Sequence, residues 1–298
     1  MLKVVDCHHH LWDLSANRYP WLTDTLVRPI YGSYAGIRRD YKIEEFLAEA
    51  TDVEVVGTVH VEAGHDPDDP VAETRWLTDV AQRPDARGVP HGIVAFADFR
   101  SDAVLRQLEE HAAFARVRGV RQVLNPRKDP WREIEDDPSR DPDWRRRIGL
   151  LKRFGLSFDV QIYYQQMATM AALADEHPDV LFILNHTGMP ARRDAEGLEG
   201  WRKGIRELAQ RSNFVAKISG FGMVEPAWTV DSIRPFVLDI IDAFGTERAM
   251  FASNYPVDKL MRGYCEIWQA YDAVVSEFSA EERDRLFCAN ALAHYRLF

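Results

Sequence analysis

Three consecutive histidines lie near the N-terminus, directly after an apolar segment, in the run Asp6-Cys7-His8-His9-His10. Alternate residues of an extended strand point to the same side. His8 and His10 would therefore share one face at the end of the strand, with Cys7 and His9 on the opposite face. Imidazole nitrogens bind zinc and similar divalent ions well. The pair predicts a site that holds one ion or one substrate oxygen, and His9 is expected to be structural or to support that site.

Two later apolar segments also end in polar residues. His186 follows one of them, Asn254 follows the other, and Asp258 comes four residues after Asn254. A histidine at the end of a buried strand can serve as a metal ligand or as a general base. We expect catalytic roles for His186, Asn254 and Asp258. The expected ligands of a metal ion are His8, His10 and His186.

Five further residues lie toward the ends of apolar segments and are expected to bind substrate. They are His60, Arg121, Gln161, Tyr163 and Lys217. The planar guanidinium of Arg121 suits a carboxylate. Lys217 shares a strand face with Val215 and Ser219 and would point into the site, although a lysine can also extend its charge to solvent. A purely structural role is the alternative for each of the five.

These positions fit together if the apolar segments are the strands of one barrel. Eight short apolar or β-branched segments alternate with segments of helical periodicity, as in a parallel sheet that is covered on both faces. The pattern predicts an α/β fold, a single (β/α)8 TIM barrel over residues 1–298, with the active site at the C-terminal face of the strands. An open doubly wound sheet usually carries a glycine-rich turn after its first strand, where this chain has histidines. The eight segments are 3–8, 53–61, 91–97, 119–124, 156–162, 180–185, 213–219 and 248–253.

Two connections between these segments are unusually long, at residues 11–42 and 125–143. Each follows a predicted strand, so in a barrel both would lie over the mouth. Long loops inside a compact domain are usually functional or disordered. The second connection is densely charged, which favours a solvated surface over a functional loop.

Composition limits the possible partners. The 298 residues include 37 Lys and Arg against 47 Asp and Glu, a net charge of −10, which disfavours nucleic acid. The sequence shows no apolar run long enough for a membrane span and no signal-peptide pattern, so a cytoplasmic protein is expected. Three cysteines are too few for a disulfide framework. The expected partner is a small-molecule substrate, and the sequence does not indicate an oligomeric state.

Several of these segments resemble the amidohydrolase superfamily, in particular its branch of TIM-barrel lactonases that includes fuconolactonase and 2-pyrone-4,6-dicarboxylate lactonase. The resemblance covers essentially the whole chain in order and implies a barrel enzyme that opens a small sugar-derived or aromatic-catabolism lactone. It also implies one divalent ion, most commonly zinc, although some members of the branch work without a metal. The matching pieces are Asp6-x-His8-x-His10, Arg18-Tyr19-Pro20-Trp21-Leu22, Gly119-Val120-Arg121-Gln122, Asn185-His186-Thr187-Gly188, Lys217-Ile218-Ser219-Gly220 and Ser253-Asn254-Tyr255-Pro256.

One position departs from the pattern of this family, which ends its eighth strand with an aspartate that binds metal or activates water. Asn254 stands there in this chain, and a neutral amide cannot take a proton at neutral pH. Asp258, His186 or Glu62 would then act as the base, and an ion would be held only weakly. Two other functions stay open: a non-oxidative decarboxylase or lyase on the same barrel, and a barrel that binds a ligand without turnover.

Overall fold

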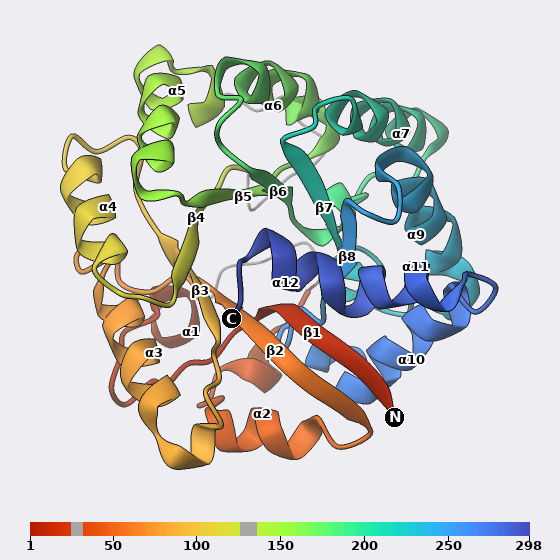
Figure 1. Cartoon of the computed structure of the whole chain (residues 1–298), viewed down its shortest axis with the longest axis horizontal. Helices are drawn as coiled ribbons and strands as arrows, with labels where there is room; N and C mark the ends of the chain where they lie inside the picture. The colour runs from red at the N-terminus through yellow and green to blue at the C-terminus, as the bar shows by residue number, and fades with distance from the viewer. Residues whose placement is uncertain (25–31, 126–135) are drawn as a thin grey trace.

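The computed structural model describes residues 1–24, 32–125 and 136–298. Its centre is a sheet of eight strands in the order β1 to β8, and every neighbouring pair is parallel. The helices surround this sheet (Figure 1). The fold is the predicted (β/α)8 barrel. The strands are β1 (Leu2–His9), β2 (Val53–Val61), β3 (Gly92–Phe96), β4 (Val117–Val123), β5 (Ser157–Gln161), β6 (Phe182–Leu184), β7 (Phe214–Ile218) and β8 (Ala249–Phe251).

The barrel is closed where β1 meets the residues just after β8. The backbone N–H of Asn254 donates to the oxygen of His8 at 2.8 Å, and the N–H of His10 donates to the oxygen of Tyr255 at 2.7 Å. Below these bonds the carboxylate of Asp6 accepts from the backbone N–H of Ser253 at 3.0 Å. We call this junction of β1 with residues 252–255 the seam. The seam joins the first and last strands of the sheet directly beneath the predicted active site.

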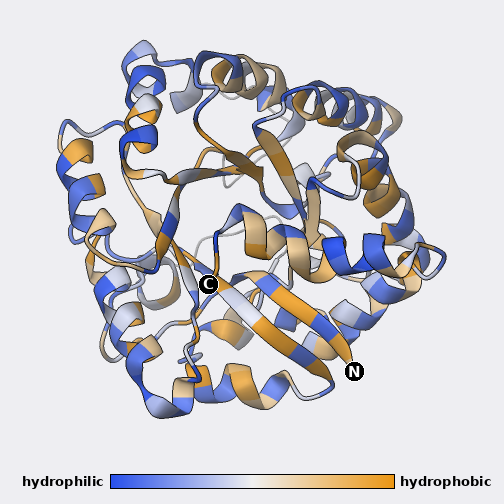
Figure 2. Ribbon diagram, viewed as in Figure 1, coloured by the Kyte–Doolittle hydropathy of each residue, from blue (hydrophilic) through white to orange (hydrophobic). Residues whose placement is uncertain are grey.

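The helices lie mainly between successive strands, with their polar faces outward (Figure 2). Among the described residues, a helix at 142–148 is followed by a 3-10 helix at 149–154, and Asp194 caps the start of the helix at 195–209. No helix of the described part is both long and apolar enough to cross a membrane. The α-helices are α1 (Pro20–Thr23), α2 (Ile43–Glu49), α3 (Ala72–Gln82), α4 (Val104–Ala112), α5 (Pro142–Ile148), α6 (Tyr164–Glu176), α7 (Ala195–Ala209), α8 (Phe221–Val224), α9 (Val230–Phe244), α10 (Tyr264–Val274), α11 (Ala280–Asp284) and α12 (Asn290–His294).

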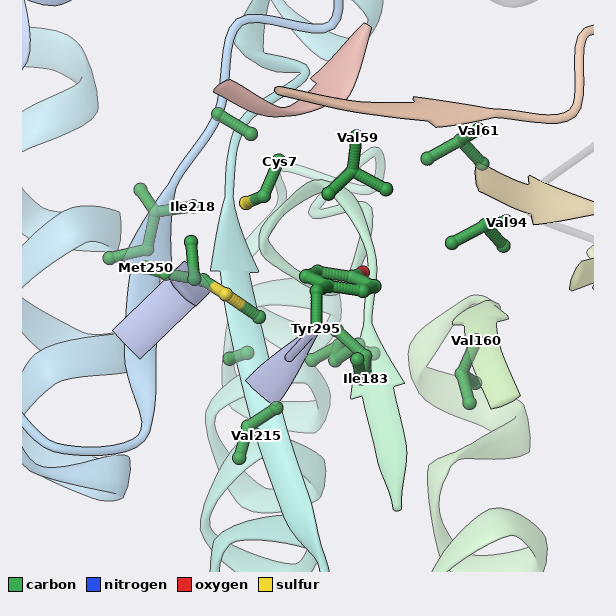
Figure 3. Packing of buried hydrophobic residues seen from close by; sticks show 14 of the residues in the cluster. Cys7, Val59, Val61, Val94, Val160, Ile183, Val215, Ile218, Met250 and Tyr295 are labelled. Carbon is green, nitrogen blue, oxygen red and sulfur yellow. The ribbon is translucent and has the colours of Figure 1, made fainter. Parts of the chain in front are cut away.

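The space inside the barrel is filled by side chains. Branched and sulfur-containing residues of several strands surround the ring of Tyr295, which directly follows α12 (Figure 3). Tyr295 is completely buried. The end of the barrel around Tyr295 is therefore a packed core. A site can form only at the other end of the barrel, where the strands have their C-terminal ends.

Strand β1 contains an irregularity that the sequence pattern did not predict. Its pairing with β2 shifts register between Asp6 and His9. Cys7 lies among the core residues beside Val59 (Figure 3), while His8 contacts Lys217 from β7. The expectation that Cys7 points away from His8 is therefore wrong, because a shift of register lets two adjacent residues face the interior.

Candidate active site

A cavity of about 490 Å³ opens at the C-terminal ends of the strands. The predicted site residues in its wall are His10, Glu62, Arg121, Gln161, Tyr163, His186 and Asn254. The other predicted site residues do not line it and are buried elsewhere: His8, His60, Lys217 and Asp258.

Apolar side chains that were not predicted form another part of the wall. Trp21 and Tyr34 come from the long connection after β1, Met189 follows β6, and Met223 follows β7. The aromatic residues of the 11–42 connection were the available signal for the first two, whereas the methionines had no pattern. Parts of both long connections, residues 25–31 and 126–135, lie outside the described residues, so their predicted place over the mouth stays a prediction.

Three histidine rings gather at this end of the barrel. The ring centre of His8 lies 5.1 Å from that of His10 and 4.4 Å from that of His186. His9 points the other way and stacks on Phe46 from α2, with 4.6 Å between ring centres. The chain thus brings together imidazoles from the ends of β1 and β6.

The tautomer of His10 is fixed by the backbone. Its Nδ1 lies 2.7 Å from the carbonyl oxygen of Val61 at the end of β2. A carbonyl can only accept, so Nδ1 carries the proton and Nε2 keeps its lone pair. Burial lowers the pKa of His10 well below its ordinary value, and the charge of Arg121 acts in the same direction. His10 is therefore a neutral ring whose Nε2 can accept a proton.

His8 lies between two cations. The Nζ atom of Lys217 is 3.4 Å from Nδ1 of His8, and Nη1 of Arg121 is 3.5 Å from Nε2. Ammonium and guanidinium groups only donate, and a neutral imidazole can accept on only one nitrogen, so Lys217 and Arg121 compete for the lone pair of this ring. Burial, followed by the charge of Lys217, lowers the pKa of His8 well below its ordinary value.

His186 lies in an unusual turn just after β6. Its φ is +53°, and Thr187 after it has a φ of +57°. Positive φ is a strained conformation for β-branched residues. The Oγ1 of Thr187 compensates by donating to the oxygen of Ser219 at 3.0 Å and accepting from its N–H at 3.2 Å. Ser219 also places its hydroxyl 3.2 Å from Nδ1 of His186, which fixes the ring against the cavity.

Arg121 is the principal cation of the cavity wall and is held on several sides. Its Nε donates to Oε1 of Glu62 at 2.7 Å, and its Nη2 donates to the backbone oxygen of the same residue at 2.6 Å. Nη1 donates to Gln161 at 3.1 Å and to Asn185 at 3.4 Å. A guanidinium has five N–H donors, so one N–H on Nη2 has no acceptor among the described residues. Arg121 is thus a rigid donor with one hydrogen to offer.

Asn254 and Asp258 form a polar pair beside the seam. Asn254 has a φ of +58°, and its side-chain Nδ2 is buried without a hydrogen-bond partner in the described part of the chain. Asp258 lies behind it and packs so closely on Gly222 that a methyl group there would clash with Oδ1. Burial raises the pKa of Asp258 to about 7. The carboxyl does not line the cavity, so its predicted catalytic role would be exerted through Asn254.

His60 and Lys217 do not line the cavity. His60 alternates with Val59 and Val61 along β2, and its ring lies beside that of His9 with 5.8 Å between centres. Lys217 points into the barrel but forms an ion pair of 2.5 Å with Asp159 below the cavity. That these two residues bind substrate stays a prediction.

The donor set does not fit the expected zinc site. Within residues 1–24, 32–125 and 136–298, no three His, Cys, Asp or Glu side chains are arranged to hold a metal ion. Zinc sites normally use at least three protein ligands. Both ring nitrogens of His8 face cationic donors, and Asn254 offers only a neutral amide. The assignment of His8, His10 and His186 as metal ligands stays a prediction, and no step below depends on it.

Comparisons with known proteins agree with this architecture. The family model described as Amidohydrolase matches residues 5–297. The chain is 47% identical over 298 residues to the protein y4mH of Sinorhizobium fredii, covering 99% of each. It is 28% identical to an L-fucono-1,5-lactonase of Burkholderia multivorans, covering 98% of this chain and 96% of that protein.

Two solved structures have the same fold. An amidohydrolase of Burkholderia multivorans with bound zinc superposes with a TM-score of 0.81 at 24% identity, covering 100% of both chains. A putative 2-pyrone-4,6-dicarboxylic acid hydrolase of Pseudomonas putida superposes with a TM-score of 0.73 at 18% identity, covering 100% of this chain and 98% of that one. Together with the match of the family model over nearly all residues, the barrel and its histidines show that the chain belongs to the amidohydrolase family.

Proposed function

We propose that the protein is a lactonase, which adds water to the carbonyl carbon of a small sugar-derived or aromatic-catabolism lactone and opens its ring. The observation that carries this proposal is chemical complementarity within one cavity. His10 offers an unprotonated Nε2, whereas Arg121 and Asn254 each offer an N–H without a partner among the described residues. Hydrolysis needs both kinds of group. The lactonase relatives support the same reaction class.

In the proposed reaction, the carbonyl oxygen accepts hydrogen bonds from Arg121 and Asn254. The Nε2 atom of His10 takes a proton from the attacking water, and a new bond forms between water oxygen and carbonyl carbon. The tetrahedral intermediate then collapses with cleavage of the ring C–O bond, and the leaving oxygen receives the proton from His10. His186, fixed by Ser219 in the same wall, is the second candidate for the base.

Asp258 is assigned a positioning role in this mechanism. Its carboxyl is buried behind Asn254 and does not line the cavity. Holding the amide in one orientation would aim Nδ2 at the substrate oxygen. This arrangement needs no metal ion, and the proposed partner is a small molecule that fits a cavity of about 490 Å³.

The test is a set of lactones, including L-fucono-1,5-lactone and pyrone carboxylates, assayed with a pH indicator after subtraction of spontaneous hydrolysis. Wild-type protein should release acid, and His10→Gln should lose that activity. His177→Gln is the matched control, because this histidine bonds to the backbone oxygen of Arg145 outside the cavity wall. Release of carbon dioxide from aromatic acids would instead indicate a decarboxylase. Ligand binding without any product would indicate a binding protein.

A further inference from the structure

The hydroxyl of Tyr295 is a polar group inside the apolar core of the barrel. The ring is enclosed by residues such as Val59, Ile183 and Val215 (Figure 3). The hydroxyl lies 2.9 Å from Oδ1 and 3.1 Å from Oδ2 of Asp159, a completely buried carboxylate of β5. A residue that follows the last helix thus reaches up the barrel axis toward the cavity.

Asp159 connects Tyr295 to two other strands. Its Oδ1 accepts from Nζ of Lys217 on β7 at 2.5 Å and from Nδ2 of Asn185 after β6 at 2.9 Å. Its Oδ2 has no hydrogen bond in the described part of the chain other than that from Tyr295. Nζ of Lys217 also lies 5.0 Å from the centre of the Tyr295 ring. The tyrosine therefore contacts both members of a buried ion pair.

Each of these connections continues to the active site. The Nζ atom of Lys217 lies 3.4 Å from Nδ1 of His8 and competes with Arg121, whose Nη1 lies 3.5 Å from Nε2, for the lone pair of that ring. Asn185 accepts through Oδ1 from Nη1 of Arg121 at 3.4 Å. One carboxylate thus supports a histidine beside the cavity and the arginine in its wall.

We propose that Tyr295 is a positioning residue of the active site, acting through Asp159 on Lys217 and Asn185. Without the hydroxyl, Oδ2 of Asp159 would be buried with no partner, and the carboxylate would rotate to regain one, since an unpaired buried charge is costly. Rotation would move the acceptor away from Lys217 and release the orientation of His8. The kinetic part of this inference rests on the proposed function, whereas the tautomer of His8 does not.

The experiment compares Tyr295→Phe with Tyr271→Phe. Both tyrosines are buried, and the hydroxyl of Tyr271 bonds, among the described residues, only to the backbone oxygen of Ala252. On a lactone that the wild type hydrolyses, Tyr295→Phe should lower kcat by about 10- to 100-fold, as losing a supporting partner of a site residue typically does, with KM nearly unchanged. Tyr271→Phe should keep the wild-type kcat. Equal kcat for wild type and Tyr295→Phe would overturn the proposal.

A second readout does not require turnover. Nitrogen NMR of isotope-labelled histidine, with His8 assigned by its replacement with Gln, reports which ring nitrogen carries the proton. The distribution of the proton between the two nitrogens of His8 should be the same in the wild type and in Tyr271→Phe, and should change in Tyr295→Phe. An unchanged distribution in Tyr295→Phe would refute the inference. If no lactone is hydrolysed by the wild type, the proposed function fails while this measurement still decides the role of Tyr295.

The double variant Lys217→Met with Asp159→Asn covers the case in which Tyr295→Phe does not fold. It removes both charges together and therefore leaves no unpaired buried ion. The distribution of the proton on His8 should again differ from that of the wild type, because Lys217 no longer donates to Nδ1 while Arg121 still faces Nε2. An unchanged His8 in the double variant would show that the ion pair does not determine the tautomer and would overturn the proposal.

Discussion

Asn254 occupies a position where its side chain decides the chemistry of the cavity. An aspartate there could accept a proton, whereas the amide presents a buried Nδ2 that lacks a partner among the described residues. In the proposed mechanism this N–H stabilises the developing oxyanion. We expect Asn254→Ala to lower kcat by roughly 10²–10³, the usual effect of losing one positioned donor.

The control for this variant addresses the backbone. A φ of +58° is unfavourable for alanine and easy for glycine. Asn254→Gly should therefore recover the melting temperature that alanine loses and still show the low kcat. Steady-state kinetics and thermal melting of both variants check the prediction. Wild-type kcat in Asn254→Gly would mean that the amide does not contact the transition state.

His9 offers a stability prediction at the same scale. Its ring is buried and stacks on Phe46, yet neither nitrogen has a partner in the described part of the chain. A buried polar group without a hydrogen bond costs about 1–3 kcal/mol. His9→Phe keeps an aromatic ring and removes both unpaired nitrogens, so the free energy of unfolding should rise by about 1–2 kcal/mol in urea titrations. A loss of stability would indicate that the nitrogens have a partner, such as a buried water.

The sequence predicted the positions of the site residues better than their orientations. Alternation along one strand placed His8 and His10 together, and the ends of apolar runs located His186 and Asn254. The protonated nitrogen of each ring depends on Val61 or Lys217, and that pairing exists only after folding. The spacing of polar residues along the sequence therefore does not predict this pairing.

At the scale of elements, the seam between β1 and β8 contains a titratable group. Asp6 accepts from the N–H and hydroxyl of Ser253 and from the hydroxyl of Tyr264, at 3.0, 2.6 and 3.1 Å. Burial nevertheless outweighs these bonds and raises the pKa of Asp6 from 3.8 to about 6. A carboxyl whose pKa is higher in the folded state binds more protons when folded, so its contribution to stability is largest below pH 4 and is lost as pH rises through 6.

Asp6→Asn tests this seam. The amide cannot ionise, so between pH 4 and pH 7 the stability of the variant should fall less than that of the wild type, by on the order of 3 kcal/mol. Urea unfolding at both pH values provides the comparison. Asp258 and Glu73, whose pKa values burial raises to about 7 and about 8, change stability in the same direction in both proteins and therefore cancel. Parallel pH profiles for the two proteins would contradict the assignment.

The elements themselves were largely predictable, because a strand buried on both faces is a continuous apolar run. The segments predicted for β6 and β8 were longer than the strands in the structure. Residues such as Asn185 and Ser253 stay buried beyond the last paired residue of the strand, so burial alone does not mark where the strand ends. The register shift in β1 was not predictable, because it is a property of the pairing with β2. The position of the Tyr295 ring inside the barrel was not predictable either, because an isolated aromatic residue near a terminal helix can pack in many places.

At the scale of the whole molecule, membership of the amidohydrolase family does not decide whether this protein needs a metal ion for activity. The cations beside both nitrogens of His8 and the neutral amide of Asn254 leave too few ligands for a firmly held zinc ion. We expect dialysis against a chelator to leave the lactonase activity within about twofold, since no ion would be needed to supply the nucleophile or to polarise the carbonyl.

Asn254→Asp is the matched variant for this prediction, because it restores an anionic oxygen at the barrel mouth and should raise the zinc affinity measured by calorimetry. Activity that disappears with the chelator and returns on addition of zinc would show that the wild-type site does use a metal. Unchanged zinc affinity in Asn254→Asp would mean that this side chain does not face an ion.

The seam also has a consequence for how the protein assembles. Asp6 and Ser253 are 247 residues apart in sequence, and joining such distant segments carries a large loop-closure cost that slows folding. His8 and Asn254 meet only when this last junction forms, so a chain with most of its helices in place would still be inactive. As urea is raised, turnover should disappear before far-ultraviolet circular dichroism changes; coincident transitions would instead mean that the seam opens only when the whole barrel unfolds.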